Sequence, residues 1–218
     1  DRATSIRYVR DNRTTVAETL NSTSKCTNRS TNSGVLHLIA PSGELDYNFS
    51  TTPPDAGNVL HSARLQLINS GADSGSGQIT LIDSTALTGV PPSGDFAFGL
   101  LGVDSTGQHY GSAGRFTADT SGNITAGLLD SNGAAAAALG APQSDATVVG
   151  TLSAPDVNGR GTATLQVGSS SSTLVYYIVN ASKLLLMNID PTVGSARESG
   201  FMTAQTGNVS AATFDASA

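Results

Sequence analysis

The feature that most constrains the fold is a series of short apolar segments, separated by turn-forming residues, that fills the stretch 159–204. Apolar residues nowhere recur there with the spacing of an amphipathic helix. The segments are of strand length, and Gly, Ser, Asn, Asp and Pro occupy the gaps between them. The stretch therefore predicts four consecutive β-strands, at 162–167, 174–179, 184–189 and 200–204.

Residues 94–159 add four more segments of the same kind. Phe96, Phe98 and Leu100 stand at every second position, the pattern of a strand with one buried face. The stretch 130–145 is expected to be a loop or a single turn, since its five alanines are too few for a stable isolated helix. Eight sequential strands are the usual content of an up-and-down barrel. The expected fold class is therefore all-β, an antiparallel meander forming an eight-stranded up-and-down barrel or a sandwich.

A partial or diverged copy of this module lies upstream. Its strand-like segments match the last four strands of the complete module in order, with a period of about 120 residues, which is typical of tandem domains. Only about 33 residues precede the copy, whereas about 67 precede its counterpart, so the copy lacks part of the fold. Open edges of an incomplete sheet recruit strands. The matching segments are 35–39, 45–49, 63–70 and 77–81.

These boundaries predict five parts. The expected parts are a polar, basic N-terminal segment that could act as a donor strand (1–33), a partial β-module (34–90), a linker (91–94), a complete β-module (95–205), and a C-terminal linker or start of a further strand (206–218). The last part resembles the linker and first-strand region that follows residue 83.

The motifs of the complete module are similar to a known group of proteins. They resemble uncharacterised tandem β-modules of large secreted bacterial surface proteins, closely over residues 94–206 and loosely over residues 35–90. The resemblance implies export and tandem organisation, and it carries over no catalytic residue. The motifs are Phe-Ala-Phe-Gly-Leu (96–100), Gly-Arg-Phe-Thr-Ala-Asp (114–119), Gly-Asn-Ile-Thr-Ala-Gly (122–127), Gly-Arg-Gly-Thr-Ala-Thr-Leu (159–165) and Tyr-Tyr-Ile-Val-Asn-Ala-Ser-Lys-Leu-Leu-Leu-Met (176–187).

Composition narrows the classes of function. Only 13% of residues are charged, against roughly 25% in an ordinary soluble protein, and this balance favours an extracellular or cell-surface location. Residues 1–30 carry six basic and three acidic groups and residues 31–218 carry five and fourteen, so a +3 head precedes a −9 body. The head could dock onto another copy or be a solvated tail. The acidic body argues against nucleic acid as a partner. The sequence contains no run of about 20 apolar residues, so it predicts no membrane-spanning helix.

No residue pattern predicts catalysis, a cofactor or a metal site. His37, His61 and His109 lie in or beside separate strands without metal-ligand spacing, so local hydrogen bonds are expected for them. Cys26 is the only cysteine, which excludes an internal disulfide. The Asp-x-x-Gly segments fit hairpin turns and not the calcium-binding loop of an EF-hand. We therefore expect a protein that is not an enzyme.

The interior of the complete module is expected to be bulky and apolar, with little polar lining, which predicts a filled core and no ligand pocket. The expected interior residues are Phe96, Phe98, Leu100, Phe116, Ile124, Leu128, Val148, Leu152, Leu165, Val167, Tyr176 and Ile178.

The two adjacent strands at 174–179 and 184–189 are apolar on both faces, whereas a strand with one solvent-exposed face alternates between apolar and polar residues. Burying each extra side chain is worth about 1.5–3 kcal/mol, so something is expected to cover them. The cover could be another module, another subunit or the N-terminal segment, and the alternative is the centre of a two-sheet sandwich. The predicted interface residues are Val175, Tyr177, Val179, Leu184 and Leu186.

These observations favour a non-enzymatic extracellular structural protein, a subunit of a surface assembly or filament made through terminal strands and apolar sheet faces. Its expected partners are other copies of itself or neighbouring modules. The alternative is an adhesion or glycan-binding module that displays loops from a β-barrel to a glycan or cell surface. A hydrolase with an unrecognised carboxylate pair is a third hypothesis. Asn-x-Ser/Thr triplets make Asn12, Asn21 and Asn28 candidate glycosylation sites.

Overall fold

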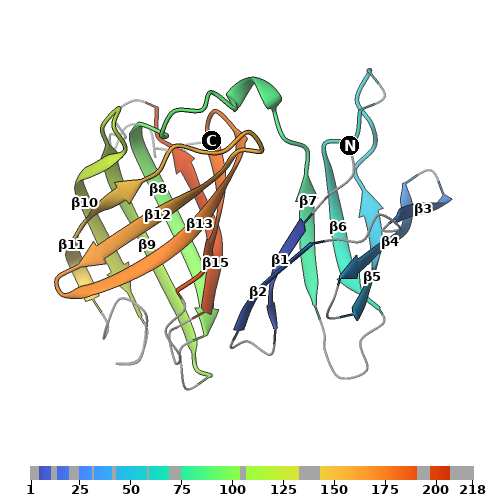
Figure 1. Cartoon of the computed structure of the whole chain (residues 1–218), viewed down its shortest axis with the longest axis horizontal. Coiled ribbons are helices and arrows are strands. Elements are labelled where there is room, and N and C mark those ends of the chain that lie inside the picture. Colours follow the sequence, from blue (N-terminus) through green and yellow to red (C-terminus); the bar gives the residue numbers. More distant parts are fainter. Residues whose placement is uncertain are drawn as a thin grey trace, which may run out of the picture. The chain divides into compact units, whose positions relative to one another are not determined.

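A computed structural model describes residues 5–10, 14–19, 25–30, 32–40, 43–57, 59–68, 75–103, 107–132, 143–190 and 197–206. Their regular structure is almost entirely β-strand (Figure 1), which confirms the predicted all-β class. The chain divides into two compact units, Asp1–Asp83 and Ser84–Ala218. The division falls ahead of the expected linker at 91–94, because the segment that begins at Ser84 packs with the second unit.

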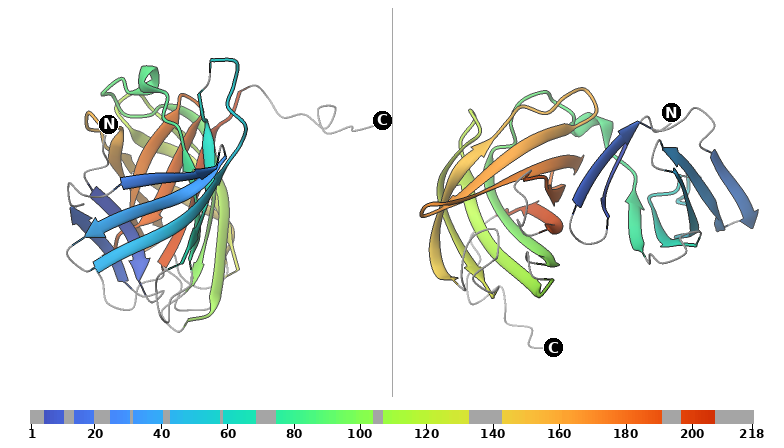
Figure 2. Two further views of the ribbon diagram at one scale, coloured as in Figure 1. Left: turned by 90° about the vertical axis from the view of Figure 1, so that its right-hand side faces the viewer. Right: turned by 60° about the horizontal axis from the view of Figure 1, so that its bottom comes forward.

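The second unit is a closed antiparallel barrel of eight strands. Each strand pairs with the next in sequence, and β15 pairs with β8 to complete the curved wall (Figure 2). This is the predicted up-and-down barrel, and not the sandwich. The strands are β8 (Gly94–Val103), β9 (His109–Ala118), β10 (Asn123–Ser131), β11 (Gln143–Leu152), β12 (Arg160–Val167), β13 (Ser170–Asn180), β14 (Lys183–Asn188) and β15 (Arg197–Ala204).

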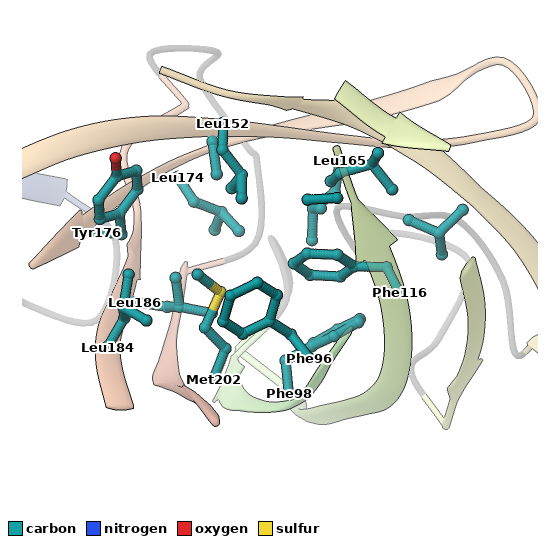
Figure 3. Packing of buried hydrophobic residues seen from close by; sticks show 14 of the residues in the cluster. Phe96, Phe98, Phe116, Leu152, Leu165, Leu174, Tyr176, Leu184, Leu186 and Met202 are labelled. Carbon is teal, nitrogen blue, oxygen red and sulfur yellow. The ribbon is translucent and has the colours of Figure 1, made fainter. Parts of the chain in front are cut away.

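Inward-pointing side chains fill this barrel with one hydrophobic cluster. The ring centres of Phe96 and Phe98 lie 5.6 and 5.9 Å from that of Phe116, and Met202 belongs to the same cluster (Figure 3). The predicted interior is confirmed at eleven positions. They are Phe96, Phe98, Leu100, Phe116, Ile124, Val148, Leu152, Leu165, Val167, Tyr176 and Ile178.

Leu128 is the one expected interior residue that lies on the outside. It is 36% exposed, whereas its neighbour Leu129 is completely buried. The pairing of β10 with β9 and with β11 shifts register after Ile124. Such an irregularity changes which side chains point inward beyond it. The alternation Ile124, Ala126, Leu128 therefore assigns the wrong face to the second half of β10.

Two Asp-x-x-Gly segments form hairpin turns, as predicted. In each, one carboxylate oxygen of the aspartate, Asp119 or Asp156, accepts backbone N–H groups from residues two and four positions later, at 2.8–3.0 Å. The glycine that follows, Gly122 or Gly159, has a positive φ of 85° or 76°. Local hydrogen bonds and a glycine conformation thus account for both loops.

One end of the barrel is covered by the segment that precedes β8. The 3₁₀ turn η1 (Ser84–Ala86) contacts β13, and Ala86 and Leu87 pack against the core cluster. The buried Tyr176 donates a hydrogen bond from its hydroxyl to the carbonyl oxygen of Ser153 at 2.6 Å. The opposite end, where β8, β10, β12 and β14 finish, is called the loop end below.

The first unit holds two antiparallel sheets. One is a hairpin of β1 (Ser5–Arg10) and β2 (Thr14–Thr19). The other, called the open sheet below, is a five-stranded meander of β3 (Lys25–Ser30), β4 (Ser33–Ala40), β5 (Gly43–Thr51), β6 (Ser62–Leu67) and β7 (Ser76–Thr80).

Residues 1–33, expected as a polar, basic segment, contribute β1, β2 and β3. Strand β3 pairs with β4 of its own chain. Backbone hydrogen bonds to neighbouring strands hold polar sequences in a sheet, and the side-chain pattern does not record them.

The two units follow the same order of strands. The repeated segments lie in β4–β7 and β12–β15, which are both antiparallel meanders. A further strand precedes each meander, β3 or β11, and a hairpin precedes that strand, β1–β2 or β9–β10. The difference is β8, which pairs with both β15 and β9 and closes the barrel. The described part of the first unit contains no counterpart of β8.

Candidate functional site

The open sheet is apolar on one face. Leu36 pairs with Tyr47, and Phe49 pairs with Leu65, and residues paired directly across antiparallel strands point to the same side. These side chains are only partly buried. On β7 the same face continues with Ile79, which pairs with Ala63 and is 43% exposed.

A cavity of about 200 Å³ is hollowed into this apolar face beside β7. Leu81, just beyond the end of β7, is 50% exposed at its rim. Within the described strands β7 pairs only with β6, so its other side is an open sheet edge. The cavity is lined by Leu36, Phe49, Thr51, Leu60, His61, Ser62, Ala63, Ile79 and Leu81.

Of the predicted interface residues, three lie on the outside of the barrel and two do not. Val175, Tyr177 and Val179 alternate along β13 with residues of the interior cluster, so they point outward. Leu184 and Leu186 belong to the interior cluster, and their assignment to an interface is wrong. Both faces of β14 carry leucine, so only the pairing with β13 and β15 reveals which face is the core.

The side chains on the outer face of these strands differ in exposure. Val175 and Val179 are 0% and 4% exposed in the isolated chain. Leu185, which pairs with both Tyr177 and Phe201, is 39% exposed, and Phe201 is 51% exposed. The ammonium of Lys183 lies 5.6 Å from the centre of the Phe201 ring.

Leu101 on β8, a diagonal neighbour of Phe201 across the β15–β8 pair, is 75% exposed. We call Leu101, Tyr177, Leu185 and Phe201 the outer patch. The alternation within β14 and β15 could have indicated it, once the barrel register was known.

A layer of polar side chains lies inside the barrel near its loop end, below the apolar core. Ser172 pairs with the interior residue Leu165, Asn188 pairs with Leu174, and Glu198 and Tyr110 both pair with Gly102. The members of this polar layer are Tyr110, Ser112, Ser172, Asn188 and Glu198, and all are buried. Asn188 donates a hydrogen bond from Nδ2 to the Ser172 hydroxyl at 2.8 Å.

Glu198 is the most strongly perturbed acid of this layer. It is 2% exposed, and burial raises its pKa from the ordinary 4.5 to about 7, although the nearby Asn188 amide favours the ionised form. Neither carboxylate oxygen has a hydrogen-bond partner of good geometry in the described chain. Burial and the charge of Glu198 also raise the pKa of Tyr110 to about 12.

The polar layer was not predicted from the sequence. The sequence pattern predicts an apolar interior with little polar lining. Its signal is the inward alternation of Ser172, Asn188 and Glu198, which becomes visible only when the strands are placed in register. Buried polar groups without direct partners usually hold ordered water or a polar ligand. The loop end of the barrel therefore has the chemistry of a small polar site.

Two histidines form local contacts, as predicted. Nε2 of His61 lies 2.8 Å from Oδ2 of Asp55, and this hydrogen bond is the main cause of a lowered pKa of Asp55. Nδ1 of His37 lies 3.3 Å from Oε1 of Glu44 and 2.5 Å from Oδ1 of Asp46.

His37, Glu44 and Asp46 form a cluster whose ligand atoms lie within 4.8 Å of one another, so this cluster could hold a metal ion. This cluster was not predicted from the sequence, because its three residues meet only across the β4–β5 hairpin. Structural zinc sites use four ligands, of which the described residues supply three.

Of the candidate glycosylation sites, Asn12 and Asn21 lie outside the described residues, and Asn28 lies in β3. The expected alanine-containing loop also lies largely outside them. Within the described residues, no helix is long and apolar enough to cross a membrane. Comparison with models of protein families and with curated proteins found no match for this chain.

Proposed function

We propose that the chain is a non-enzymatic structural subunit of an extracellular assembly, joined to other copies of itself or to neighbouring modules through open sheet edges and apolar sheet faces. The observation that carries the proposal is the open sheet of the first unit. Its edge strand β7 pairs on one side only within the described chain, and its apolar face is partly exposed. Open edges beside apolar surface favour association with further strands.

The outer patch supports the same function from the second unit. It places Leu185 and Phe201 side by side on neighbouring strands, with Leu101 next to them. Exposed side chains of this size favour contact with another protein surface. The low content of charged residues, 13%, supports a location outside the cell.

Electron microscopy and light scattering of the purified chain over a range of concentrations test this function. We expect ordered polymers or defined oligomers. Replacing Leu185 and Phe201 together with serine should shift assembly to higher concentration if the outer patch takes part. The matched control is Val149→Ser, which changes an exposed aliphatic residue, 42% exposed, on β11. A wild-type chain that stays monomeric at all accessible concentrations would refute the proposal.

A second candidate function is an adhesion or glycan-binding module that uses the loop end of the barrel. The polar layer favours it, because Tyr110 and Ser112 hydroxyls and the Glu198 carboxyl are buried there without well-placed partners. Screening against a glycan array, with Glu198→Gln and Tyr110→Phe as site variants, distinguishes the two functions. Binding that both variants abolish would favour this candidate.

A further inference from the structure

We propose that the open edge of β7 accepts one extended strand, and that this strand is the segment 207–218 of a second copy of the chain. The inference rests on the assembly function above and names the contact that joins one subunit to the next. Each copy would then offer one acceptor edge and one donor segment. A contact between two different surfaces of the same protein repeats head to tail, and it builds a closed ring or an open filament.

Comparison with the barrel indicates which kind of strand would pair with the free side of β7. The motif Ser-Gly-x-apolar-Thr occurs at 76–80 in β7 and at 199–203 in β15, so Ile79 corresponds to Met202. In the barrel, β8 pairs with the outer side of β15. Met202 is 1% exposed in that closed wall, whereas Ile79 is 43% exposed. A strand added to β7 would give Ile79 the cover that β8 gives Met202.

A glycine at the acceptor edge supports the same reading. Gly200 in β15 has no room for a side chain, because a Cβ there would overlap the backbone carbonyl oxygen of Gly99 on β8. Gly77 holds the same motif position in β7. The nearest atom to its Cβ position is Cδ1 of Leu65, at 4.0 Å. The described first unit therefore leaves room for a larger residue, and glycine is what the close approach of a further strand requires.

The sequence of the donor segment resembles the residues that lead into β8. Thr88-Gly89 precedes Phe96 by the same spacing as Thr206-Gly207 precedes Phe214. From Ala212 to the end of the segment, apolar and polar residues alternate, the pattern of a strand with one buried face. The apolar set is Ala212, Phe214, Ala216 and Ala218, and Thr213, Asp215 and Ser217 stand between them.

This register places the aromatic residue of the donor at the cavity. Phe96 pairs with Ala204 in the barrel, and the shared motif makes Leu81 the counterpart of Ala204. Phe214 therefore falls opposite Leu81, at the rim of the 200 Å³ cavity. Aliphatic cavities of about 150 Å³ accept a benzene ring. Backbone hydrogen bonds along β7 would supply affinity, and the seated ring would supply specificity.

The test mixes two full-length variants. Gly77→Val blocks the acceptor but keeps the donor, and Phe214→Ser weakens the donor but keeps the acceptor. We expect each variant alone to stay monomeric and an equimolar mixture to form a one-to-one dimer in sedimentation. Ser76→Val and Thr213→Ser are the matched controls and should assemble like the wild type. If Gly77→Val does not fold, Ile79→Lys replaces it, because that side chain is 43% exposed.

A peptide of residues 206–218 provides a second readout. Labelled with a fluorophore, it should bind the Phe214→Ser chain and cap wild-type assembly. The peptide that carries Phe214→Ser should bind with an affinity at least about tenfold lower, because no aromatic ring fills the cavity. A mixture that stays monomeric, or variants that assemble like the wild type, overturns the strand contact and leaves the assembly function standing. Peptide binding by a wild-type chain that never polymerises supports the acceptor and refutes the assembly function.

Discussion

Replacing Glu198 with glutamine is expected to remove much of the pH dependence of barrel stability between pH 5 and pH 8. The carboxyl group is 2% exposed, and burial raises its pKa from 4.5 to about 7. The folded barrel therefore holds the proton more tightly than the unfolded chain does. Glutamine has nearly the same shape and no charge to lose, so the variant isolates this one ionisation.

The sign and the size follow from the shift. Below pH 4.5 both states are protonated and the contribution of Glu198 to stability is fully present. As the pH rises toward 7, the unfolded chain loses its proton first, and the free energy of unfolding falls by about 1.4 kcal/mol per pH unit. Above pH 7 both states are ionised and the loss levels off. Between pH 5 and pH 8 the expected loss is about 2.5 kcal/mol.

Urea denaturation of the wild type and of Glu198→Gln at pH 5, 6, 7 and 8 measures this loss. Amide hydrogen exchange in β8, β14 and β15 reports the barrel separately from the first unit. Comparing the two pH profiles cancels any constant cost of the glutamine amide. Asp145→Asn, which changes an exposed carboxylate of β11, is the control. Parallel profiles for Glu198→Gln and the wild type would show that this carboxyl group does not ionise in a buried place.

Three further predictions concern the barrel wall and core. Gly200→Ala should unfold the barrel or cost about 3 kcal/mol or more, whereas Gly99→Ala, with no atom within 4 Å of its Cβ position, should fold normally in thermal denaturation. Tyr176→Phe should lower the free energy of unfolding by about 1 kcal/mol, since it removes a 2.6 Å hydrogen bond to a backbone carbonyl; an unchanged urea midpoint would contradict this. Leu129→Ala should cost about 2–5 kcal/mol and Leu128→Ala much less, because only Leu129 is buried; equal losses would show that the irregularity in β10 is misplaced.

Strands and turns were predictable because their signals are local. The inward positions of Phe96, Phe98 and Leu100 follow from alternation within one strand, and the structure confirms them. The turn at Asp119 follows from an aspartate and a glycine a few residues apart, and its hydrogen bonds span four residues. Such features depend on neighbours along the chain, which the sequence records directly.

Predictions failed where two faces of a strand looked alike or where the register shifted. Leu184 and Leu186 were assigned to an interface, but pairing with β13 and β15 directs their side chains into the core. Leu128 was assigned to the core, but the irregular pairing of β10 turns it outward. In each case the deciding contact is with another strand, and a shift of one residue exchanges the two faces.

The candidate sites depend still more on tertiary structure. The expected alternation and motif spacing of the donor segment 207–218 can be read from the chain alone. The unpaired side of β7, the cavity beside Ile79, and the polar layer around Glu198 cannot, because each gathers side chains from strands far apart in sequence.

By itself the sequence determined that this chain forms short antiparallel strands joined by tight turns, since alternation and turn chemistry act over a few residues. The tertiary structure alone decided that one set of strands closes through β15 and β8 while the other keeps an open edge. The physical reason is that closure depends on a backbone pairing between strands about 100 residues apart in the chain, and a hydrogen-bonded edge carries no side-chain signature.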